Sequence, residues 1–524
     1  MLRPLHALDR SLRRAFGAAD AAMNRLYSWR YNPLYLSGAL TAALLAILIA
    51  TGLYLLLYYR IGAPYASVAR LAEQPWAGRW IRGVHRYASD AAIITAGVHA
   101  LRMFAQGRRW GPRALAWISG LALLALVWVC GWTGYVMVWD VFGQLLAAEG
   151  ARFLDVLPIF GEPIGRIFVG ERPIPGAFFF LNLFAHIAIP IGLGGVLWLH
   201  VSRVQRPVLI PPRRLLWTMT ALLVATAIVW PMGMAAEGSP FRIPASAPID
   251  LLYAFWLPVT HGVNAVTVWL AGGLLTAIAV LVPWWSRPRA AARPVASLVD
   301  ERRCTGCEQC ALDCPFEAIT MIARTDGRAT LVAHVDPDRC VSCGICTGSC
   351  APMGVGPAGR TGRDQLAEVR AFVEQRRPDG GTIVLVACTQ AAGGTASSPE
   401  LPGAMRFPVN CAGNLHSSTV EFLVRAGVQG VLVLACPPRD CWNREGVRWT
   451  EERIFHEREA ELQERVDRRR VRIAYASAGE RTEAIAAIAA FRADLAALDA
   501  AAAESNIDVE RPCALDDPAL QETR

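Results

Sequence analysis

Six apolar stretches occupy most of the first 285 residues and limit what this part of the chain can fold into. Each is long enough to cross the hydrocarbon core of a bilayer as a helix, which takes about 20 residues. They lie at 34–58, 84–105, 114–138, 178–202, 214–235 and 258–284. Of the 524 residues, 54% are hydrophobic. The part of the chain that follows residue 285 is more polar than the part before it. We therefore expect a multidomain protein that begins with an all-α, six-helix transmembrane bundle.

Arginines crowd the N-terminus, alternate loops between the apolar stretches and the exit from the last stretch. By the positive-inside rule these regions face the cytoplasm. We expect a multi-pass protein of a prokaryotic cytoplasmic (inner) membrane with both termini inside. Residues 1–30 lack the apolar core and cleavage site of a signal peptide, so we interpret them as a basic cytoplasmic leader. Since the arginines lie beside the spans, the net charge of +8 does not indicate a nucleic-acid partner.

Two of the apolar stretches carry histidine pairs with the same spacing. His85 and His99 are fourteen residues apart in the second stretch, as are His186 and His200 in the fourth. Fourteen residues return to nearly the same helix face and rise by about 21 Å. The second and fourth helices are parallel, so we expect His85 to face His186 near the outer surface and His99 to face His200 near the cytoplasm. Each pair suits one bis-imidazole haem; the alternative is four satisfied buried histidines.

Glycines repeat at the same interval in the first and third stretches. A missing side chain at each depth would let a flat porphyrin approach the helix backbone. The glycines are Gly38, Gly52, Gly120 and Gly134. They support a di-haem bundle.

Residues 31–286 resemble the cytochrome b subunit of the quinol-oxidising cytochrome bc complexes. The resemblance rests on the histidine pairs, the segment GWTGYVMVWD at 131–140, and Arg82 and Arg102, each three residues from a histidine. It implies two b haems that form a transmembrane electron wire, with quinone sites near each end. It also implies that Arg82 and Arg102 contact haem propionates, although Arg102 equally suits a positive-inside charge.

The chain departs from that family at the outer quinol site. The family's Pro-Glu-Trp-Tyr is replaced by Pro-Ile-Asp-Leu at 248–251, and its Leu-Pro-Trp by Met-Val-Trp at 137–139. We therefore do not expect bifurcating quinol oxidation. Asp250, Tyr253 and His261 are polar candidates for a quinone site, or else interfacial anchors and packing residues.

A cysteine-rich segment at 299–356 follows an Arg/Pro/Ala linker at 287–298. It contains two C-x₂-C-x₂-C-x₃-C runs, a spacing that indicates metal binding rather than disulfides. Three thiolates of one run hold a cubane whose fourth ligand comes from the other run. The expected [4Fe–4S] ligand sets are Cys304, Cys307, Cys310 with Cys350, and Cys340, Cys343, Cys346 with Cys314. Zinc is the alternative.

This segment resembles the bacterial two-cluster ferredoxins, which implies a small α+β ferredoxin-like domain. A linker helix is expected in 357–380.

The domain at 381–502 contains three short β-type runs, each of which ends on a cysteine: Cys388, Cys411 and Cys436. Helical segments alternate with these runs and with a fourth strand, which predicts a parallel α/β sheet. Ligands of such sheets gather beyond the carboxyl ends of the strands, so the three cysteines and Cys441 are expected to converge. The alternative is four buried or redox-active thiols without a metal. Residues 503–524 form a tail.

The segments NCAGN and AGVQGVLVLACPPRDCWNREG resemble the iron–sulfur subunit that links methyl-viologen-reducing hydrogenases and some formate dehydrogenases to heterodisulfide reductases. The resemblance implies a [2Fe–2S] cluster. The family's second cysteine corresponds to Ala391 here. We expect Cys130 and Cys513 not to be ligands.

These features together predict a membrane-anchored electron-transfer subunit between the quinone pool and a cytoplasmic redox partner. By resemblance the partner is a heterodisulfide-reductase-like flavoprotein, a hydrogenase or a formate dehydrogenase, and the protein is a homodimer. The alternatives are a self-sufficient quinol–ferredoxin oxidoreductase and a membrane redox sensor or scaffold.

Overall fold

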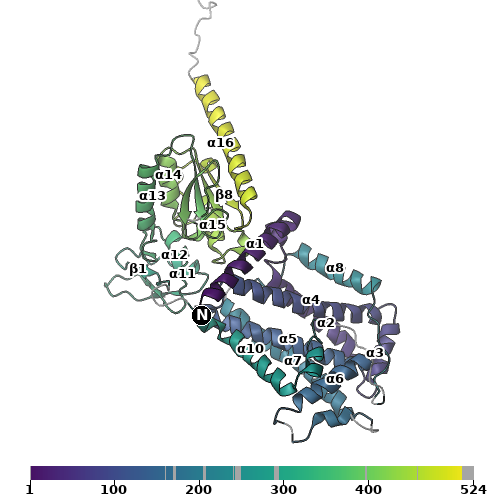
Figure 1. The fold of residues 1–524 in the computed structure, drawn as a ribbon. Helices are drawn as coiled ribbons and strands as arrows, with labels where there is room; N and C mark the ends of the chain where they lie inside the picture. Colours follow the sequence, from purple (N-terminus) through teal and green to yellow (C-terminus); the bar gives the residue numbers. More distant parts are fainter. Residues whose placement is uncertain are drawn as a thin grey trace, which may run out of the picture. The chain divides into compact units, whose positions relative to one another are not determined.

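A computed structural model describes residues 2–159, 161–168, 173–204, 208–239, 241, 250–287, 294–395, 398–456 and 458–509. The chain divides into two compact units, Met1–Arg293 and Pro294–Arg524. The first unit is helical and the second contains the sheets (Figure 1). The predicted multidomain organisation is thus confirmed, and each unit is described by itself.

The N-terminal unit has a helix in each of the six predicted stretches. Its elements are α1 (Leu2–Tyr31), α2 (Ser37–Leu56), α3 (Pro64–Glu73), α4 (Gly78–Ala105), η1 (Gly111–Arg113), α5 (Ala114–Val138), α6 (Val141–Leu154), η2 (Ile164–Phe168), α7 (Gly176–Val204), α8 (Arg213–Val229), α9 (Leu257–Gly262) and α10 (Ala265–Trp285). Among the described residues, four helices are long and apolar enough to cross a membrane: α2, α5, α7 and α10. Of the other two, α8 has 17 residues and α4 carries several charged side chains.

Small side chains let the helices of this unit approach each other closely. Helix α2 packs on α4, α5 packs on α7, and α4 also contacts α5 and α8 (Figure 1). Ala88 and Ala92 of α4 are fully buried and lie in a cluster with Leu44 of α2. A Cβ atom at Gly83 would lie 2.9 Å from the Cβ of Ala227 in α8, so the α4–α8 contact requires glycine there.

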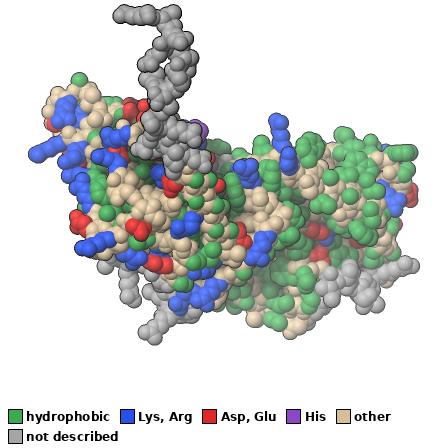
Figure 2. Space-filling model, turned by 90° about the horizontal axis from the view of Figure 1, so that it is seen from above, with side chains coloured by type: hydrophobic (Ala, Val, Ile, Leu, Met, Phe, Trp, Pro, Cys, Tyr) green, Lys and Arg blue, Asp and Glu red, His purple; other side chains and the backbone are tan. Residues whose placement is uncertain are grey.

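Large apolar side chains point outward from this unit. Leu57, Trp198 and Ile191 are 80%, 73% and 74% exposed. Figure 2 shows hydrophobic side chains covering much of the visible face of the N-terminal unit. An apolar surface of this extent is typical of a protein that faces lipid or a partner.

The leader at 1–30 forms helix α1, which is attached to the bundle by buried ion pairs. Arg102 of α4 contacts Asp20 with both terminal nitrogens, at 2.7 and 3.0 Å. Arg109 contacts Asp9 at 2.7 Å. Helix α6 was not predicted; it begins where Asp140 accepts a hydrogen bond from the Gly143 amide.

The C-terminal unit begins with two short antiparallel ribbons and two single-turn helices. The ribbons pair β1 with β4 and β2 with β3. The elements are β1 (Leu298–Val299), α11 (Gln309–Leu312), β2 (Ile319–Ile322), β3 (Val332–Val335), α12 (Ile345–Gly348) and β4 (Val355–Gly356). The expected linker at 287–298 lies partly outside the described residues.

The rest of this unit is a four-stranded parallel sheet in the order β6-β5-β7-β8, with helices around it (Figure 1). All four strands lie where the sequence predicts them. The elements are α13 (Gly362–Arg376), β5 (Ile383–Cys388), β6 (Met405–Val409), η4 (Ala412–Asn414), α14 (Ser417–Arg425), β7 (Gly430–Ala435), η5 (Pro438–Asp440), α15 (Gly446–Phe455), η6 (Arg468–Arg470), β8 (Val471–Tyr475) and α16 (Arg481–Val509).

Strands β5 and β7 are buried along their whole length, because both are central in the sheet. Helix α13 occupies the predicted linker helix and begins with a capping box formed by Thr361 and Asp364. Helix α16 ends at Val509, seven residues beyond the predicted domain boundary at 502. The rest of the predicted tail, with Cys513, lies outside the described residues.

We expect Leu432→Ala to destabilise the sheet by 2–5 kcal/mol, on the order typical of a cavity in a closed core. Leu432 lies in the middle of β7 and is 0% exposed. Native-state hydrogen exchange of the β7 amides in the full-length protein measures the loss. The exposed Gln463→Ala should change it by less than about 0.5 kcal/mol. A loss below about 1 kcal/mol for Leu432→Ala would show that the strand is not part of a tightly packed core.

Candidate functional site

The structure places His85 of α4 opposite His186 of α7. Their ring centres are 6.5 Å apart and the rings are tilted by 57°. An imidazole nitrogen binds a metal at about 2 Å, so two imidazoles on one ion place their ring centres roughly 6 Å apart. The pair therefore fits bis-imidazole ligation of a single iron.

The second pair, His99 and His200, also joins α4 to α7. The two side chains lie within electrostatic range of each other. The first histidine of one helix thus faces the first of the other, and the two second histidines interact electrostatically.

A hydroxyl group from a neighbouring helix contacts the Nδ1 atom of each histidine. The contacts are Thr51 to His85 at 2.8 Å, Thr133 to His186 at 2.9 Å, Ser37 to His99 at 3.4 Å and Ser119 to His200 at 3.1 Å.

Three of these hydroxyls donate their own proton to a helix carbonyl. Thr51, Ser119 and Thr133 bond to the carbonyls of Ile47, Leu115 and Cys130 at 2.7, 2.8 and 2.8 Å. A hydroxyl has one proton, so towards the imidazole it acts as the acceptor. Nδ1 then carries the hydrogen, and the Nε2 lone pair is left for a metal.

The four predicted glycines directly face the histidine rings. A Cβ atom at Gly38 would lie 2.9 Å from the His99 ring, and one at Gly134 would lie 3.2 Å from His186. The corresponding distances at Gly52 to His85 and at Gly120 to His200 are both 3.3 Å. The missing side chains thus make room for the imidazoles themselves.

Sequence reasoning missed the hydroxyls, although a signal for them was present. A serine or threonine directly precedes each of the four glycines, so the hydroxyl–glycine dipeptide repeats at the same fourteen-residue interval. The dipeptides are Ser37-Gly38, Thr51-Gly52, Ser119-Gly120 and Thr133-Gly134.

The two arginines assigned to haem propionates have protein partners in the structure. Arg82 donates to the carbonyls of Met232 at 2.7 Å and Gly233 at 3.1 Å. Arg102 is held by Asp20, and its guanidinium lies 4.9 Å from the centre of the Tyr35 ring. A propionate contact at Arg102 would therefore share the guanidinium with Asp20.

The polar candidates Asp250 and Tyr253 lie in one cluster, in which Tyr253 is buried and the charged side chains are partly buried. Asp250 accepts hydrogen bonds from the Tyr135 hydroxyl and, at 3.2 Å, from Arg86, which also pairs with Asp90. Arg86 directly follows His85, so the cluster adjoins the first histidine pair.

Tyr253 is fully buried, and its hydroxyl is 2.7 Å from that of Ser89 in α4. Its ring fills the space where a side chain at Gly131 would lie, because a Cβ atom there would be 2.1 Å from the ring. Residues 248 and 249 and the side chain of His261 lie outside the described residues.

The eight ferredoxin-type cysteines fall into the two predicted sets. Cys304, Cys307, Cys310 and Cys350 line one pocket. Cys310 interacts electrostatically with the other three and also with Cys346 of the second set. In the other set, Cys346 interacts with Cys314, Cys340 and Cys343. Each set thus takes its fourth member from the other run.

The two cysteine loops share one backbone geometry. In each loop the residues on either side of the second cysteine have positive φ: Gly306 and Glu308 at 79° and 64°, and Ser342 and Gly344 at 56° and 80°. Four residues after the last cysteine of each run, an amide donates back to its sulfur, from Ala318 to Cys314 at 3.4 Å and from Gly354 to Cys350 at 3.2 Å.

The buried cysteines need a stabilising group to hold a negative charge. Burial raises the pKa of the Cys346 thiol to about 12 and also raises that of Cys310. A metal ligand must be a thiolate, and a bound cation supplies the missing stabilisation. Within the described part of the chain, no three His, Cys, Asp or Glu side chains are arranged to hold a single metal ion.

Four more cysteines converge beyond the carboxyl ends of three neighbouring strands, β6, β5 and β7. Cys388 ends β5, Cys411 and Cys436 follow β6 and β7, and Cys441 follows η5. All four are buried. The Cys388 thiol is in hydrogen-bonding contact with those of Cys411 and Cys436, and Cys441 contacts Cys436. Ala391, which stands where the resembled family has its second cysteine, is buried in the turn after β5.

The four thiols differ in how well they hold a negative charge. The pKa of Cys388 is lowered well below its usual value, because Cys411 and Cys436 donate to it. The pKa values of Cys411 and Cys436 are correspondingly raised. Cys441 has a lowered pKa because Cys436 donates to its sulfur, and backbone amides also donate to it. The set suits an electron-deficient centre that binds several thiolates.

Cys130, in the other unit, lies 3.7 Å from the Nδ1 atom of His186.

Three family models match successive parts of the chain. Residues 23–208 match "Cytochrome b/b6/petB", residues 303–354 match "4Fe-4S dicluster domain", and residues 384–499 match "Methyl-viologen-reducing hydrogenase, delta subunit". The three matches occur in the predicted order.

Curated relatives match a part of the chain. The chain is 29% identical over 177 residues to "Menaquinol:cytochrome c reductase cytochrome b subunit" of Geobacillus thermodenitrificans, covering 33% of this chain and 79% of that protein. It is 32% identical over 215 residues to "Cytochrome b" of Sulfolobus acidocaldarius, covering 39% of this chain and 38% of that protein. A solved structure, "Hyperthermophilic respiratory Complex III", aligns with a TM-score of 0.40 at 17% identity over 50% of this chain and 78% of its own.

We expect Thr133→Val to raise the reduction potential of one b haem by the equivalent of about 1 kcal/mol, the typical net value of one hydrogen bond. The hydroxyl accepts from Nδ1 of His186, which strengthens this imidazole as a ligand of ferric iron. An optical redox titration measures the change. Thr220→Val is the matched control, because Thr220 hydrogen-bonds the Leu216 carbonyl. Equal shifts in both variants would contradict a specific role of the Thr133 hydroxyl.

Proposed function

We propose that this protein is a membrane-anchored electron-transfer subunit. Its chain joins a cytochrome b domain to a 4Fe–4S dicluster domain and a hydrogenase delta-subunit domain. It moves electrons between the quinone pool and a cytoplasmic oxidoreductase. The observation that carries this proposal is the histidine pair with ring centres 6.5 Å apart, in the same chain as two sets of four cysteines. Such a combination brings membrane and soluble redox centres together in one polypeptide.

The b haems supply one-electron chemistry within the membrane, and four histidines of α4 and α7 would hold them. Since α4 carries His85 and His99 fourteen residues apart, we propose that α4 also spans the bilayer. Together with α8 this makes six spans and leaves both termini on the same side. The arginine-rich loops favour the cytoplasm for that side.

The cysteines of the C-terminal unit would hold two [4Fe–4S] clusters and one [2Fe–2S] cluster. Cys304, Cys307, Cys310 and Cys350 would hold the first, and Cys314, Cys340, Cys343 and Cys346 the second. The [2Fe–2S] cluster would take Cys388, Cys411, Cys436 and Cys441. The proposed domain boundaries are 31–286, 299–356 and 381–502.

The polar cluster beside His85 is the proposed quinone site. Two carboxylates, Asp90 and Asp250, share the single guanidinium of Arg86. The Tyr135 hydroxyl donates to the same carboxylate of Asp250. Quinone reduction takes up protons and quinol oxidation releases them, and such a cluster can exchange them within hydrogen-bond reach.

The delta-subunit domain is the proposed docking site for the soluble partner. By analogy the partner is a heterodisulfide-reductase-like flavoprotein, a hydrogenase or a formate dehydrogenase, and this step rests on resemblance alone.

A potentiometric titration of the purified protein, read optically for haem and by EPR for the clusters, tests the proposal. We expect two b haems and three low-potential clusters, with the haems at higher potential, which supports flow from the partner to quinone. Haems below the clusters would reverse that direction, and absence of either cofactor class would contradict the proposal.

We expect Asp250→Asn to reduce quinone turnover by at least tenfold, the order typical of a lost proton-transfer group. The haem and cluster spectra should stay unchanged, because Asp250 contacts none of the proposed ligands in the hydrogen bonds described. The measurement is the rate of haem reduction by a water-soluble quinol. Glu162→Gln is the control, since Glu162 is 63% exposed in the same unit and pairs with Arg166. Wild-type turnover of Asp250→Asn would place the quinone elsewhere.

A further inference from the structure

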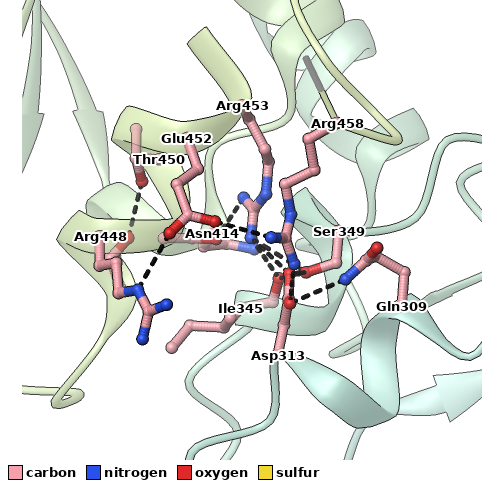
Figure 3. Close-up of polar contacts among 12 residues, drawn as sticks. Gln309, Asp313, Ile345, Ser349, Asn414, Arg448, Thr450, Glu452, Arg453 and Arg458 are labelled. Carbon is pink, nitrogen blue, oxygen red and sulfur yellow. Dashed lines mark hydrogen bonds and ion pairs between the residues drawn. The ribbon is translucent and has the colours of Figure 1, made fainter. Parts of the chain in front are cut away.

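Arg453 of α15 is a buried guanidinium between the sheet and the cysteine-rich loops (Figure 3). Its side chain is 2% exposed. It donates to the Gly413 carbonyl at 3.1 Å, to the Ile345 carbonyl at 3.3 Å and to the Ser349 hydroxyl at 2.9 Å.

Each of these acceptors is a near neighbour of a proposed cluster ligand. Ile345 directly precedes Cys346 of one ferredoxin set, and Ser349 directly precedes Cys350 of the other. Gly413 lies two residues after Cys411 of the third site. One side chain therefore contacts the loops of all three cysteine sites.

Asp313, the carboxylate that faces Arg453, also lies next to a proposed cluster ligand. Asp313 is 0% exposed and directly precedes Cys314. It accepts hydrogen bonds from Ser349 at 2.6 Å and Gln309 at 3.0 Å, and its carboxylate also pairs with Arg458 (Figure 3). Arg453 approaches it at 3.6 Å.

The charges of this cluster balance only when Glu452, which is nearer the surface, is counted with Asp313. Two guanidinium groups face the single carboxylate of Asp313, although Arg458 also pairs with Glu452 at 2.7 Å near the surface. Among the described residues, the Nε atoms of Arg453 and Arg458 have no hydrogen-bond partner. Burial lowers the pKa of Arg453 to about 10, so it stays charged at neutral pH. The same guanidinium interacts electrostatically with Cys411.

We propose that Arg453 is a positioning residue that raises the reduction potentials of the iron–sulfur centres around it, and that Asp313 opposes it. The inference rests on the proposed cofactors. Reduction adds an electron, and a fixed positive charge in a buried site stabilises the reduced state more than the same charge would in water. The opposite charges of Arg453 and Asp313 would therefore together set the reduction potentials of these iron–sulfur centres.

A purely structural role would have a different signature. A Cβ atom at Gly348 would lie 1.9 Å from Nη1 of Arg453, so the guanidinium is tightly enclosed by the α12 backbone. Loss of packing alone would lower the iron content or the stability of every variant. It would not shift potentials in opposite directions according to the charge removed.

The experiment is an EPR-monitored redox titration of full-length, cofactor-loaded Arg453→Gln and Asp313→Asn. Arg453→Gln removes the positive charge, so at a fixed potential the oxidised-to-reduced ratio of at least one cluster should rise threefold or more. Asp313→Asn removes the negative charge, so the ratio should fall by a similar factor. Threefold corresponds to about 28 mV for one electron, at 59 mV per tenfold.

Two control variants separate charge from packing. Arg453→Lys keeps the charge and should retain potentials near wild type. Arg448→Gln removes a 58% exposed arginine of the same helix, which pairs with Glu452 at 3.0 Å, and should leave all potentials unchanged. The b haem potentials serve as an internal reference in each sample.

Unchanged cluster potentials in both Arg453→Gln and Asp313→Asn, or shifts of the same sign, would overturn the inference. If Arg453→Gln does not fold, Asp313→Asn alone decides by the sign of its shift. Failure of the proposed function would look different, because wild-type protein would then lack the clusters or show no electron exchange between quinone and haem.

Discussion

The N-terminal unit depends on the hydrogen bond between an imidazole Nδ1 atom and a helix hydroxyl. Four histidines would otherwise be costly to place between apolar helices, because an unpaired buried polar group loses its water contacts. The hydroxyls of α2 and α5 satisfy one nitrogen of each ring and leave the other available. The same two helices supply the glycines that make room for the rings. The same two helices, α2 and α5, therefore both orient the imidazole rings and pack closely on α4 and α7.

In the C-terminal unit, polar contacts hold the cysteine loops against the sheet. Asn414 donates to the Gly344 carbonyl at 3.1 Å, and Gln365 of α13 donates to the Asn414 carbonyl at 2.8 Å. A Cβ atom at Gly344 would lie 2.4 Å from the Asn414 amide, so this loop needs glycine while its counterpart carries Glu308. Fully paired buried polar groups specify one arrangement more strictly than apolar contacts do. These contacts hold the loops of the three cysteine sites in one arrangement relative to one another.

The same buried contacts explain why charge matters in this unit. Arg453 and Asp313 are removed from solvent, where each charge acts at low dielectric on the loops that it touches. Removing either partner alone leaves the other charge uncompensated. A pair of apolar side chains could pack the same interface but would place no charge beside the cysteine loops.

The sequence by itself determined the periodic features. The fourteen-residue intervals of His85, His99, His186 and His200, the doubled cysteine runs and the four strands all follow from local spacing, since helix and strand repeats are short-range properties. Only the tertiary structure decided which groups from distant segments meet. Asp20 with Arg102, Arg86 with Asp250, and Arg453 with Asp313 are separated by 82, 164 and 140 residues, and no periodicity links them. Their pairing is set by helix packing and by the burial of unlike charges, which depend on the whole folded unit.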